Sequence, residues 1–157
     1  MTDGEDGSFE DRTAHLLKLA SKATARGLQD RLAQLGISYS YWTLFRILWR
    51  EDGITVTELA DRARVAKPSV VAAINSMEKD GYVERRRKEG NLKAIYIYLT
   101  KTGMELEAKL VPLALEVNEI ALNGITEYQE KRLRQMLITI IRNLDTTPNP
   151  RQPPRYR

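Results

Sequence analysis

Apolar residues recur at helical spacing over the first quarter of the chain. From about Phe9 to Leu35 they share one face, which predicts a long amphipathic helix. Gly36 follows directly and suits the left-handed position at which many helices end. A second helix is predicted from Ser38 or Ser40 to about Arg50. Because its segment "YWTLFRILWRE" is apolar on most sides, we expect this helix to lie at the buried centre of the fold.

Two shorter helices are predicted next. Thr55 and Glu58 have the spacing of a capping box, which opens a helix ending near Arg64. After a tight turn, Pro68 fits the first turn of another helix, where its missing N–H group costs nothing. This helix is expected to end at Gly81. Its buried face is expected to consist of Val70, Ala73, Ile74 and Met77.

An alternating apolar segment then predicts a β-hairpin. Strands are expected at about Tyr82–Lys88 and Ala94–Leu99, with "EGNLK" between them. The second strand alternates between two faces. The face expected to anchor the hairpin to the core carries Ile95, Ile97 and Leu99, and the opposite face carries Tyr96 and Tyr98.

The last third of the chain predicts two further helices. Thr100 is a suitable N-cap for a helix from Lys101 to about Leu122, with a kink expected at Pro112. A second capping box, Thr126–Gln129, opens a final helix that runs to about Leu144. The complete fold is therefore predicted to be mainly α with one small antiparallel β-hairpin.

Composition excludes several classes of protein. The chain has 157 residues, no cysteine and one histidine, so neither disulfides nor a metal site are expected. It also lacks a Gly-rich phosphate loop and carboxylates clustered at a likely site, so we expect no enzyme and no cofactor. No apolar run approaches the ~20 residues of a membrane span. Because the acidic N-terminus is not a secretory signal either, a cytoplasmic protein with no membrane partner is expected.

Two short helices, a tight turn between them and a hairpin after them describe a winged helix-turn-helix. The second helix of that motif fits the DNA major groove, and its side chains meet base edges. Asn75 suits adenine, and Lys67 suits a phosphate. The residues of this helix expected to contact DNA are Lys67, Pro68, Ser69, Val71, Ala72 and Asn75, and Ser76 and Lys79 share their outward face. The alternative is an ordinary solvated helix face.

The hairpin adds positive charge beside this helix. The net charge is +4, and Arg85, Arg86, Arg87 and Lys88 are consecutive in the first strand. Alternation along a strand sends about two of these side chains to either face. On its own such a run is usually solvated surface. Next to a helix-turn-helix it is well placed to follow phosphates or enter a minor groove, so we predict that it contacts DNA.

The sequence between Val56 and Leu106, "VTELADRARVAKPSVVAAINSMEKDGYVERRRKEGNLKAIYIYLTKTGMEL", resembles the winged-helix core of the MarR family of bacterial transcription regulators. The resemblance rests on "ELA", on the "MEKDGYVER" junction and on the "LTKTG" exit. The preceding "ISYSYWTLFRILWREDGIT" resembles the family helix at that place, and the resemblance covers roughly residues 10 to 145. It implies a DNA-binding regulator, expected to be a repressor, with residues 37–99 as the winged helix-turn-helix.

Two sites depart from the family pattern. The family wing usually carries Asp-x-Arg-Arg or Asp-x-Arg at its tip, where this chain reads Asn-Leu-Lys at 91–93. Asn91 cannot form the ion pair of Asp, and Lys93 lacks the planar fork of Arg. The family's recognition helix often has Arg where Ala72 and Ser76 stand. We still expect Asn91 and Lys93 to contact DNA, with more of the binding carried by the cations of the first strand. The alternative function is a protein-interaction module with weak or degenerate DNA binding.

The resemblance also implies a homodimer. Its interface would be formed by residues 9–36 and 100–144, between an N-terminal segment at 1–8 expected to be disordered and a Pro-rich tail at 145–157. The last two helices carry more apolar residues than a three-helix core needs, which supports a dimer over a larger monomeric core. A two-fold dimer would bind a pseudo-palindromic double-stranded operator with half-sites ~34 Å apart.

Finally, the resemblance implies a small-molecule effector, expected to be an aromatic carboxylate or a related thioester. The candidate contacts are His15, Tyr39, Trp42 and Arg46. Aromatic rings would provide the walls, and Arg46 would pair with the carboxylate. The alternatives are that the aromatic residues belong to the core and that Arg46 pairs with an acid such as Glu51 or Asp52.

Overall fold

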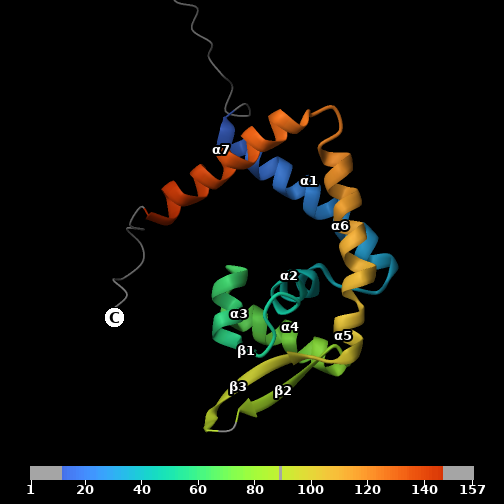
Figure 1. Cartoon of the computed structure of the whole chain (residues 1–157), viewed down its shortest axis with the longest axis vertical. Coiled ribbons are helices and arrows are strands. Elements are labelled where there is room, and N and C mark those ends of the chain that lie inside the picture. Colours follow the sequence, from blue (N-terminus) through green and yellow to red (C-terminus); the bar gives the residue numbers. More distant parts are fainter. Residues whose placement is uncertain (1–11, 89, 147–157) are drawn as a thin grey trace, which may run out of the picture. The chain divides into compact units, whose positions relative to one another are not determined.

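The computed structural model describes residues 12–88 and 90–146, and it excludes the side chains of Lys88, Asn91, Leu92 and Thr146 (Figure 1). The chain divides into two compact units, the first ending at Asn118 and the second beginning at Glu119. The predictions for residues 1–8 and for most of the Pro-rich tail lie outside the described residues.

The observed elements follow the predicted order. The first unit contains α1 (Thr13–Gln34), α2 (Tyr39–Leu48), β1 (Ile54–Thr55), α3 (Val56–Ala63), α4 (Lys67–Lys79), β2 (Val83–Lys88), β3 (Asn91–Leu99), α5 (Lys101–Glu105) and most of α6 (Glu107–Ala121). The second unit contains the end of α6 and α7 (Glu127–Thr146). The fold is mainly α with a small antiparallel sheet, which confirms the predicted fold class. None of the helices within the described ranges is long and apolar enough to span a membrane.

The first turn between helices has the geometry that its sequence predicts. Gly36 has a φ of +70°, a value that glycine adopts without a steric penalty. The N–H of Gly36 donates to the carbonyl of Ala33, and that of Ile37 donates to the carbonyl of Leu32, both at 3.0 Å. This pair of hydrogen bonds ends α1, and Leu32 and Ile37 are both buried beside it. Ser38 then caps α2 by accepting a hydrogen bond from the N–H of Ser40.

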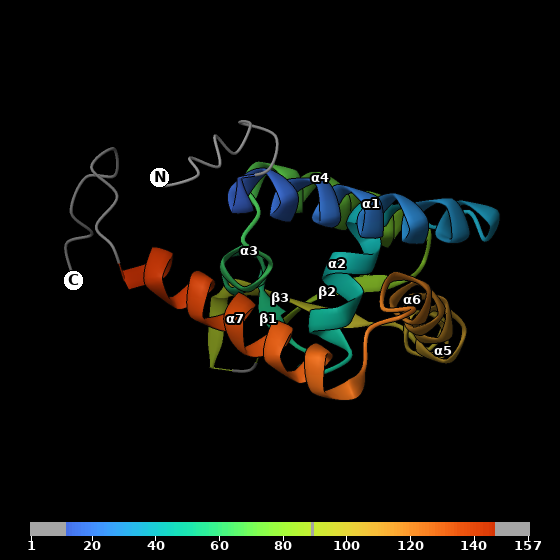
Figure 2. The same ribbon diagram turned by 90° about the horizontal axis from the view of Figure 1, so that it is seen from above.

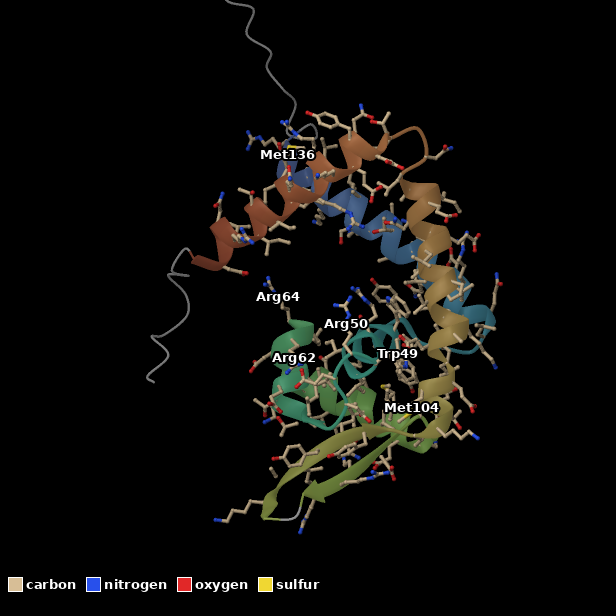
Figure 3. The ribbon with its side chains drawn as sticks, in the orientation of Figure 1. Trp49, Arg50, Arg62, Arg64, Met104 and Met136 are labelled. Atoms are coloured by element: carbon tan, nitrogen blue, oxygen red, sulfur yellow. The ribbon has the colours of Figure 1, made fainter. Side chains whose placement is uncertain are left out.

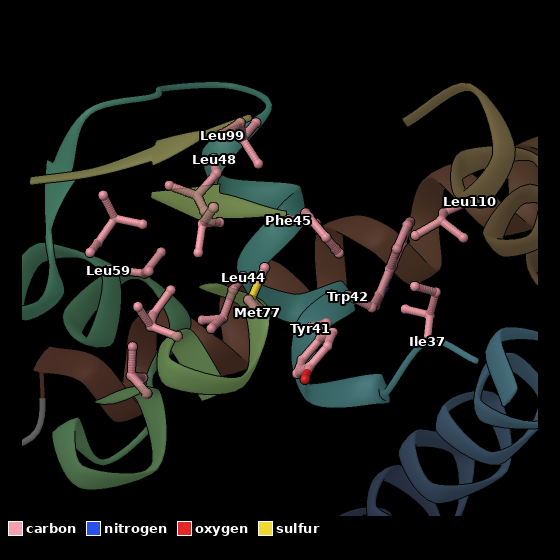
Figure 4. Packing of buried hydrophobic residues seen from close by; sticks show 14 of the residues in the cluster. Ile37, Tyr41, Trp42, Leu44, Phe45, Leu48, Leu59, Met77, Leu99 and Leu110 are labelled. Atoms are coloured by element: carbon pink, nitrogen blue, oxygen red, sulfur yellow. The ribbon is translucent and has the colours of Figure 1, made fainter. Parts of the chain in front are cut away.

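The core of the first unit surrounds α2 (Figure 4). Phe45 is fully buried, and its ring stacks on that of Trp49 with 5.1 Å between centroids. The indole N–H of Trp49 donates to the carbonyl of Gly103 at 3.0 Å, which satisfies the one polar group of this large side chain. The hydroxyl of Tyr41 donates to Asp80 at the end of α4, at 2.9 Å, and burial raises the pKa of Tyr41. The prediction that α2 is the central buried helix is confirmed.

The sheet has three antiparallel strands in the order β1-β3-β2. In the hairpin, Val83 lies opposite Leu99 and Arg85 lies opposite Ile97. Val83, Ile97 and Leu99 are buried, as expected for the anchoring face. Ile95 is 43% exposed, so the prediction that it also anchors the hairpin is wrong. The reason is length, because a strand rises about 3.3 Å per residue and two residues suffice to pass the edge of the core.

The helix predicted from Lys101 to Leu122 is interrupted at Leu106, not at Pro112. Pro112 lies inside α6, which continues through it. Figures 1 and 2 show α5 and the beginning of α6 following one another along nearly the same line. The interruption lies one turn after Gly103, whose carbonyl receives the Trp49 indole N–H. In the second unit, Thr126 and Gln129 form the predicted capping box at the start of α7.

Candidate nucleic-acid interface

The outward face of α4 is the first part of the candidate interface. Val70, Ile74 and Met77 are buried against the core, as predicted. The expected DNA-contact residues of this helix all lie on its exposed side, together with Ser76 and Lys79: Lys67, Pro68, Ser69, Val71, Ala72 and Asn75. They are therefore accessible to a groove, and with few long side chains among them, the helix can approach base edges closely.

The hairpin formed by β2 and β3 provides the cations beside α4. The alternation predicted for its first strand holds, because Arg86 lies opposite Tyr96 and Arg87 lies opposite Ile95. Arg86 pairs with Glu84, and its guanidinium lies over the Tyr98 ring, 4.9 Å from the ring centroid. Arg87 is exposed on the other face of the sheet. Arg86 is thus held against the sheet by two contacts, whereas Arg87 projects from it.

Arg85 has a different environment from its two neighbours. Its guanidinium forms an ion pair with Glu78 of α4 and donates a hydrogen bond to Oδ1 of Asn75, also of α4. Its side chain is 27% exposed. The four consecutive cations therefore do not act alike, and Arg85 joins the hairpin to the helix next to it.

The tip of the hairpin is partly described. β3 begins at Asn91, which lies opposite Lys88, and the strand register shifts between Arg87 and Lys88. Lys93 is exposed. The side chains of Lys88 and Asn91 are outside the described part of the chain, so their predicted DNA contacts remain predictions.

Known proteins resemble this chain in sequence and in fold. Residues 37–95 match the model of the MarR family. The chain is 30% identical to transcriptional regulator PA3341, whose crystal structure superimposes with a TM-score of 0.79 over 87% of this chain and 100% of that one. The chain belongs to the MarR family. This MarR-family protein is accordingly a transcriptional regulator that binds DNA.

Other MarR-family proteins show the same relationship. The organic hydroperoxide resistance transcriptional regulator of Bacillus subtilis is 23% identical over 136 residues, which are 87% of this chain and 91% of that protein. A MarR-family regulator from Listeria monocytogenes, crystallised with a 26mer DNA, is 21% identical and covers 85% of this chain and 89% of its own, with a TM-score of 0.77. These proteins are regulators and not enzymes, in agreement with the sequence-based expectation.

The four residues predicted to bind an effector in this MarR-family chain are in different surroundings. Trp42 is buried, and its ring meets that of Trp49 edge to face at 5.9 Å between centroids, so it belongs to the core. Tyr39 is at the exposed start of α2. His15 is in the first turn of α1, about 20 Å along the helix from Leu28, where α1 joins the core. The structure of one chain does not bring His15 to α2.

Arg46, the fourth predicted residue, lines a cavity of about 400 Å³ between α2 and α3. The complete lining is Thr43, Arg46, Ile47, Arg50, Arg62 and Ala63, and Figure 3 labels two of the arginines. Arg62 donates to the Glu51 carboxylate at 2.5 Å, and this hydrogen bond raises the pKa of Arg62. Arg46 lies over the Trp42 ring, 5.9 Å from its centroid. Three arginines thus line one opening, and because Arg62 is already paired with Glu51, Arg46 and Arg50 are the two that suit an anion.

Sequence reasoning missed Arg50 and Arg62 as companions of Arg46. Arg46 and Arg50 are four residues apart, which places them on one side of a helix, and this spacing was the available signal. Arg62 comes from another helix, and only the packing of α3 on α2 brings it to the cavity. Of the two acids considered as partners for Arg46, Glu51 binds Arg62, and Asp52 accepts the backbone N–H of Leu99 at 2.9 Å.

Proposed function

We propose that this MarR-family regulator is a cytoplasmic homodimeric repressor of a pseudo-palindromic operator, and that a small anion releases it from DNA. The observation that carries this proposal is the exposed face of α4 beside a hairpin with exposed cations. A helix of this kind fits the major groove, and a charged hairpin next to it follows the phosphates. Base contacts come from α4, and the salt-dependent part of the affinity comes from residues such as Lys67, Arg87 and Lys93.

Apolar side chains on the terminal helices support the homodimer. On α7, Met136, Ile141 and Leu144 are 52%, 47% and 71% exposed, and Leu115 and Ile120 of α6 are also exposed. Large apolar side chains clustered on a helix surface favour burial against another chain. A second copy offers the same apolar surfaces and produces a closed two-fold dimer. Two α4 helices would then address half-sites about one DNA turn, ~34 Å, apart.

The operator can be found by selecting duplexes from a random library with the full chain. The expected product is a pseudo-palindrome whose half-sites are one helical turn apart. Its affinity should fall steeply as salt increases, because cations that contact phosphates release counterions. Failure to enrich any sequence over random duplex at low salt would overturn the proposal and favour the protein-interaction module.

Replacing Arg87 with alanine should weaken binding to selected and random duplexes by similar factors. Arg87 projects from the hairpin, so its expected contact is with phosphate and not with a base. The slope of log affinity against log salt should decrease by about 0.9 for each half-site, or about 1.8 for the dimer. Fluorescence anisotropy at several salt concentrations measures this slope. Lys109→Ala, which removes an exposed cation from α6, is the matched control, and an equal effect there would contradict a specific role for Arg87.

The cavity between α2 and α3 supports the effector. Arg46 and Arg50 provide planar donors that pair well with a carboxylate, and Arg62 beside them is held by its ion pair with Glu51. Ile47 and Ala63 supply apolar wall next to them, and the combination suits an aromatic carboxylate or its thioester. To release DNA, such a ligand must bind the DNA-free arrangement of the dimer more tightly than the DNA-bound arrangement.

Replacing Arg46 or Arg50 with glutamine should weaken effector binding about tenfold each, since each change removes a charge-assisted hydrogen bond. Aromatic carboxylates and their coenzyme A thioesters can be screened by thermal shift, with and without the selected duplex. A hit should raise the melting temperature and release the duplex. Arg134→Gln, on the surface of α7, is the control. A hit whose affinity is unchanged in both cavity variants would place the effector elsewhere.

A further inference from the structure

Arg85 lies in the part of β2 that packs on the core. Val83, two residues earlier on the same face of the strand, is buried, and Ile97 opposite Arg85 is fully buried. The Arg85 side chain is 27% exposed, so most of it lies against its neighbours at the packed end of the sheet. Arg87 is on the same face two residues further along, where the hairpin has passed the core and its side chain is exposed. The two side chains are chemically identical, but that of Arg85 is half-buried and that of Arg87 is exposed.

The two terminal nitrogens of Arg85 contact two residues of α4. Nη1 donates to the carboxylate of Glu78, and Nη2 donates to Oδ1 of Asn75 at 2.5 Å. Asn75 and Glu78 are three residues apart and therefore neighbours on one side of the helix. A planar guanidinium can bond to both at once. A lysine ammonium is a compact charge on a flexible stem and cannot reproduce this fixed pair of contacts.

The ion pair changes what Arg85 can offer to DNA. Its positive charge is offset by the carboxylate of Glu78, so the pair has no net charge for a phosphate to attract. The salt-dependent part of the affinity grows with the number of phosphates that a protein neutralises. Arg85 therefore contributes less to that part than Arg87 does.

The hydrogen bond to Asn75 fixes the orientation of an amide on the exposed face of α4, the face proposed to enter the DNA major groove. An amide has an acceptor oxygen at one end and a donor NH₂ group at the other. Turning the Asn75 amide around would place its NH₂ donors against the N–H donors of Arg85, which is unfavourable. Asn75 is thus held with its oxygen toward the hairpin. Because an asparagine reads a base by its pattern of donor and acceptor, its orientation decides which base edge it can match.

We propose that Arg85 is a positioning residue for base readout, which fixes the amide of Asn75 and is itself held by Glu78. The proposal rests on the proposed function, because it assigns Asn75 to a base of the operator. It replaces the phosphate contact expected for Arg85 from the sequence. Specificity at one base pair of each half-site then depends on a residue that does not touch the base.

The test uses the full chain and the duplex that it selects from a random library. Asn75→Ala is measured first against all single-base variants of that duplex, to find the base pair at which discrimination falls, by about tenfold. Arg85→Lys, which keeps the charge, is measured against the same set. It should lose about tenfold in discrimination at the same base pair, keep the salt slope of the unsubstituted chain, and add nothing further in the Asn75→Ala background.

Arg87→Lys is the matched control, since it makes the same change on the same face of the strand, and it should retain discrimination at every position. Melting temperatures of all variants identify loss of folding. If Arg85→Lys keeps full discrimination, or loses affinity equally for every duplex, or adds fully to Asn75→Ala, the proposal is overturned. In each of those cases the unsubstituted chain still selects a specific duplex. If the proposed function itself were wrong, no duplex would be selected, so the two failures can be distinguished.

Discussion

Replacing Gly103 with alanine is expected to lower the melting temperature by about 6–12 °C. A Cβ atom at this position would lie 2.1 Å from the carbonyl oxygen of Tyr82 and 3.1 Å from a methyl group of Leu99. The Tyr82 oxygen cannot move easily, because it accepts the N–H of Thr100 at 3.0 Å. This hydrogen bond joins the residue before β2 to the residue after β3. Overpacking against fixed backbone costs roughly 3 kcal/mol, which corresponds to this shift for a chain of this size.

Gly27→Ala is the control for this substitution, and differential scanning fluorimetry of both variants provides the measurement. Gly27 lies within α1, and a Cβ atom there would meet the two methyl groups of Val117 at 3.4 and 3.8 Å, which are ordinary contacts. Alanine is favoured over glycine inside a helix by about 1 kcal/mol, so Gly27→Ala should leave the melting temperature unchanged or raise it. Equal losses in both variants would show that the contact with Tyr82 is not the cause.

Replacing Ile141 with glutamate is expected to separate the proposed dimer into monomers at micromolar concentration. Ile141 is 47% exposed in the single chain, so the monomer can accept a carboxylate there without burying it. A two-fold interface would contain the new charge twice, and an unpaired buried carboxylate is strongly unfavourable. Each monomer would retain one α4 helix with its hairpin. Loss of contact with the second half-site should weaken operator binding by about 100-fold or more.

Gln135→Glu introduces the same single charge on α7, about 120° around the helix from Ile141, and is the control. Sedimentation velocity gives the oligomeric state, and circular dichroism confirms that helix content is retained. A dimer that persists in Ile141→Glu would show that this side of α7 does not form the interface. Monomers that still bind the selected duplex with full affinity would show that dimerisation is not needed for operator binding.

Local signals in the sequence were sufficient to predict most of the helices and where they begin and end. The capping boxes at Thr55 and Thr126 depend on residues three positions apart, and both are present in the structure. The same is true of the end of α1, where Gly36 has the left-handed backbone that its position requires. These features depend on a few neighbouring residues, so sequence spacing determines them.

Long-range contacts were not predictable in this way. The position of the break between α5 and α6 is associated with the indole of Trp49, which is 54 positions from its acceptor in the sequence. Pro112, the local signal, indicated a different place. In the candidate interface, exposure of the α4 face followed from helical periodicity. The bonds from Arg85 to Glu78 and Asn75 did not, because they depend on how the hairpin packs against the helix.

The hydrogen bond between Trp49 and Gly103 also bears on how ligand binding is transmitted. Trp49 follows α2 directly, its ring is stacked on Phe45, and its N–H is bonded to the helix by which the chain leaves the sheet. This hydrogen bond therefore joins the end of α2 to α5. The cavity that contains Arg46 is formed in part by α2, so the proposed effector would act on the segment that leads to the proposed dimer helices. If the proposed effector binds at that cavity, the hydrogen bond from Trp49 to Gly103 would be one contact that couples it to the proposed dimer helices.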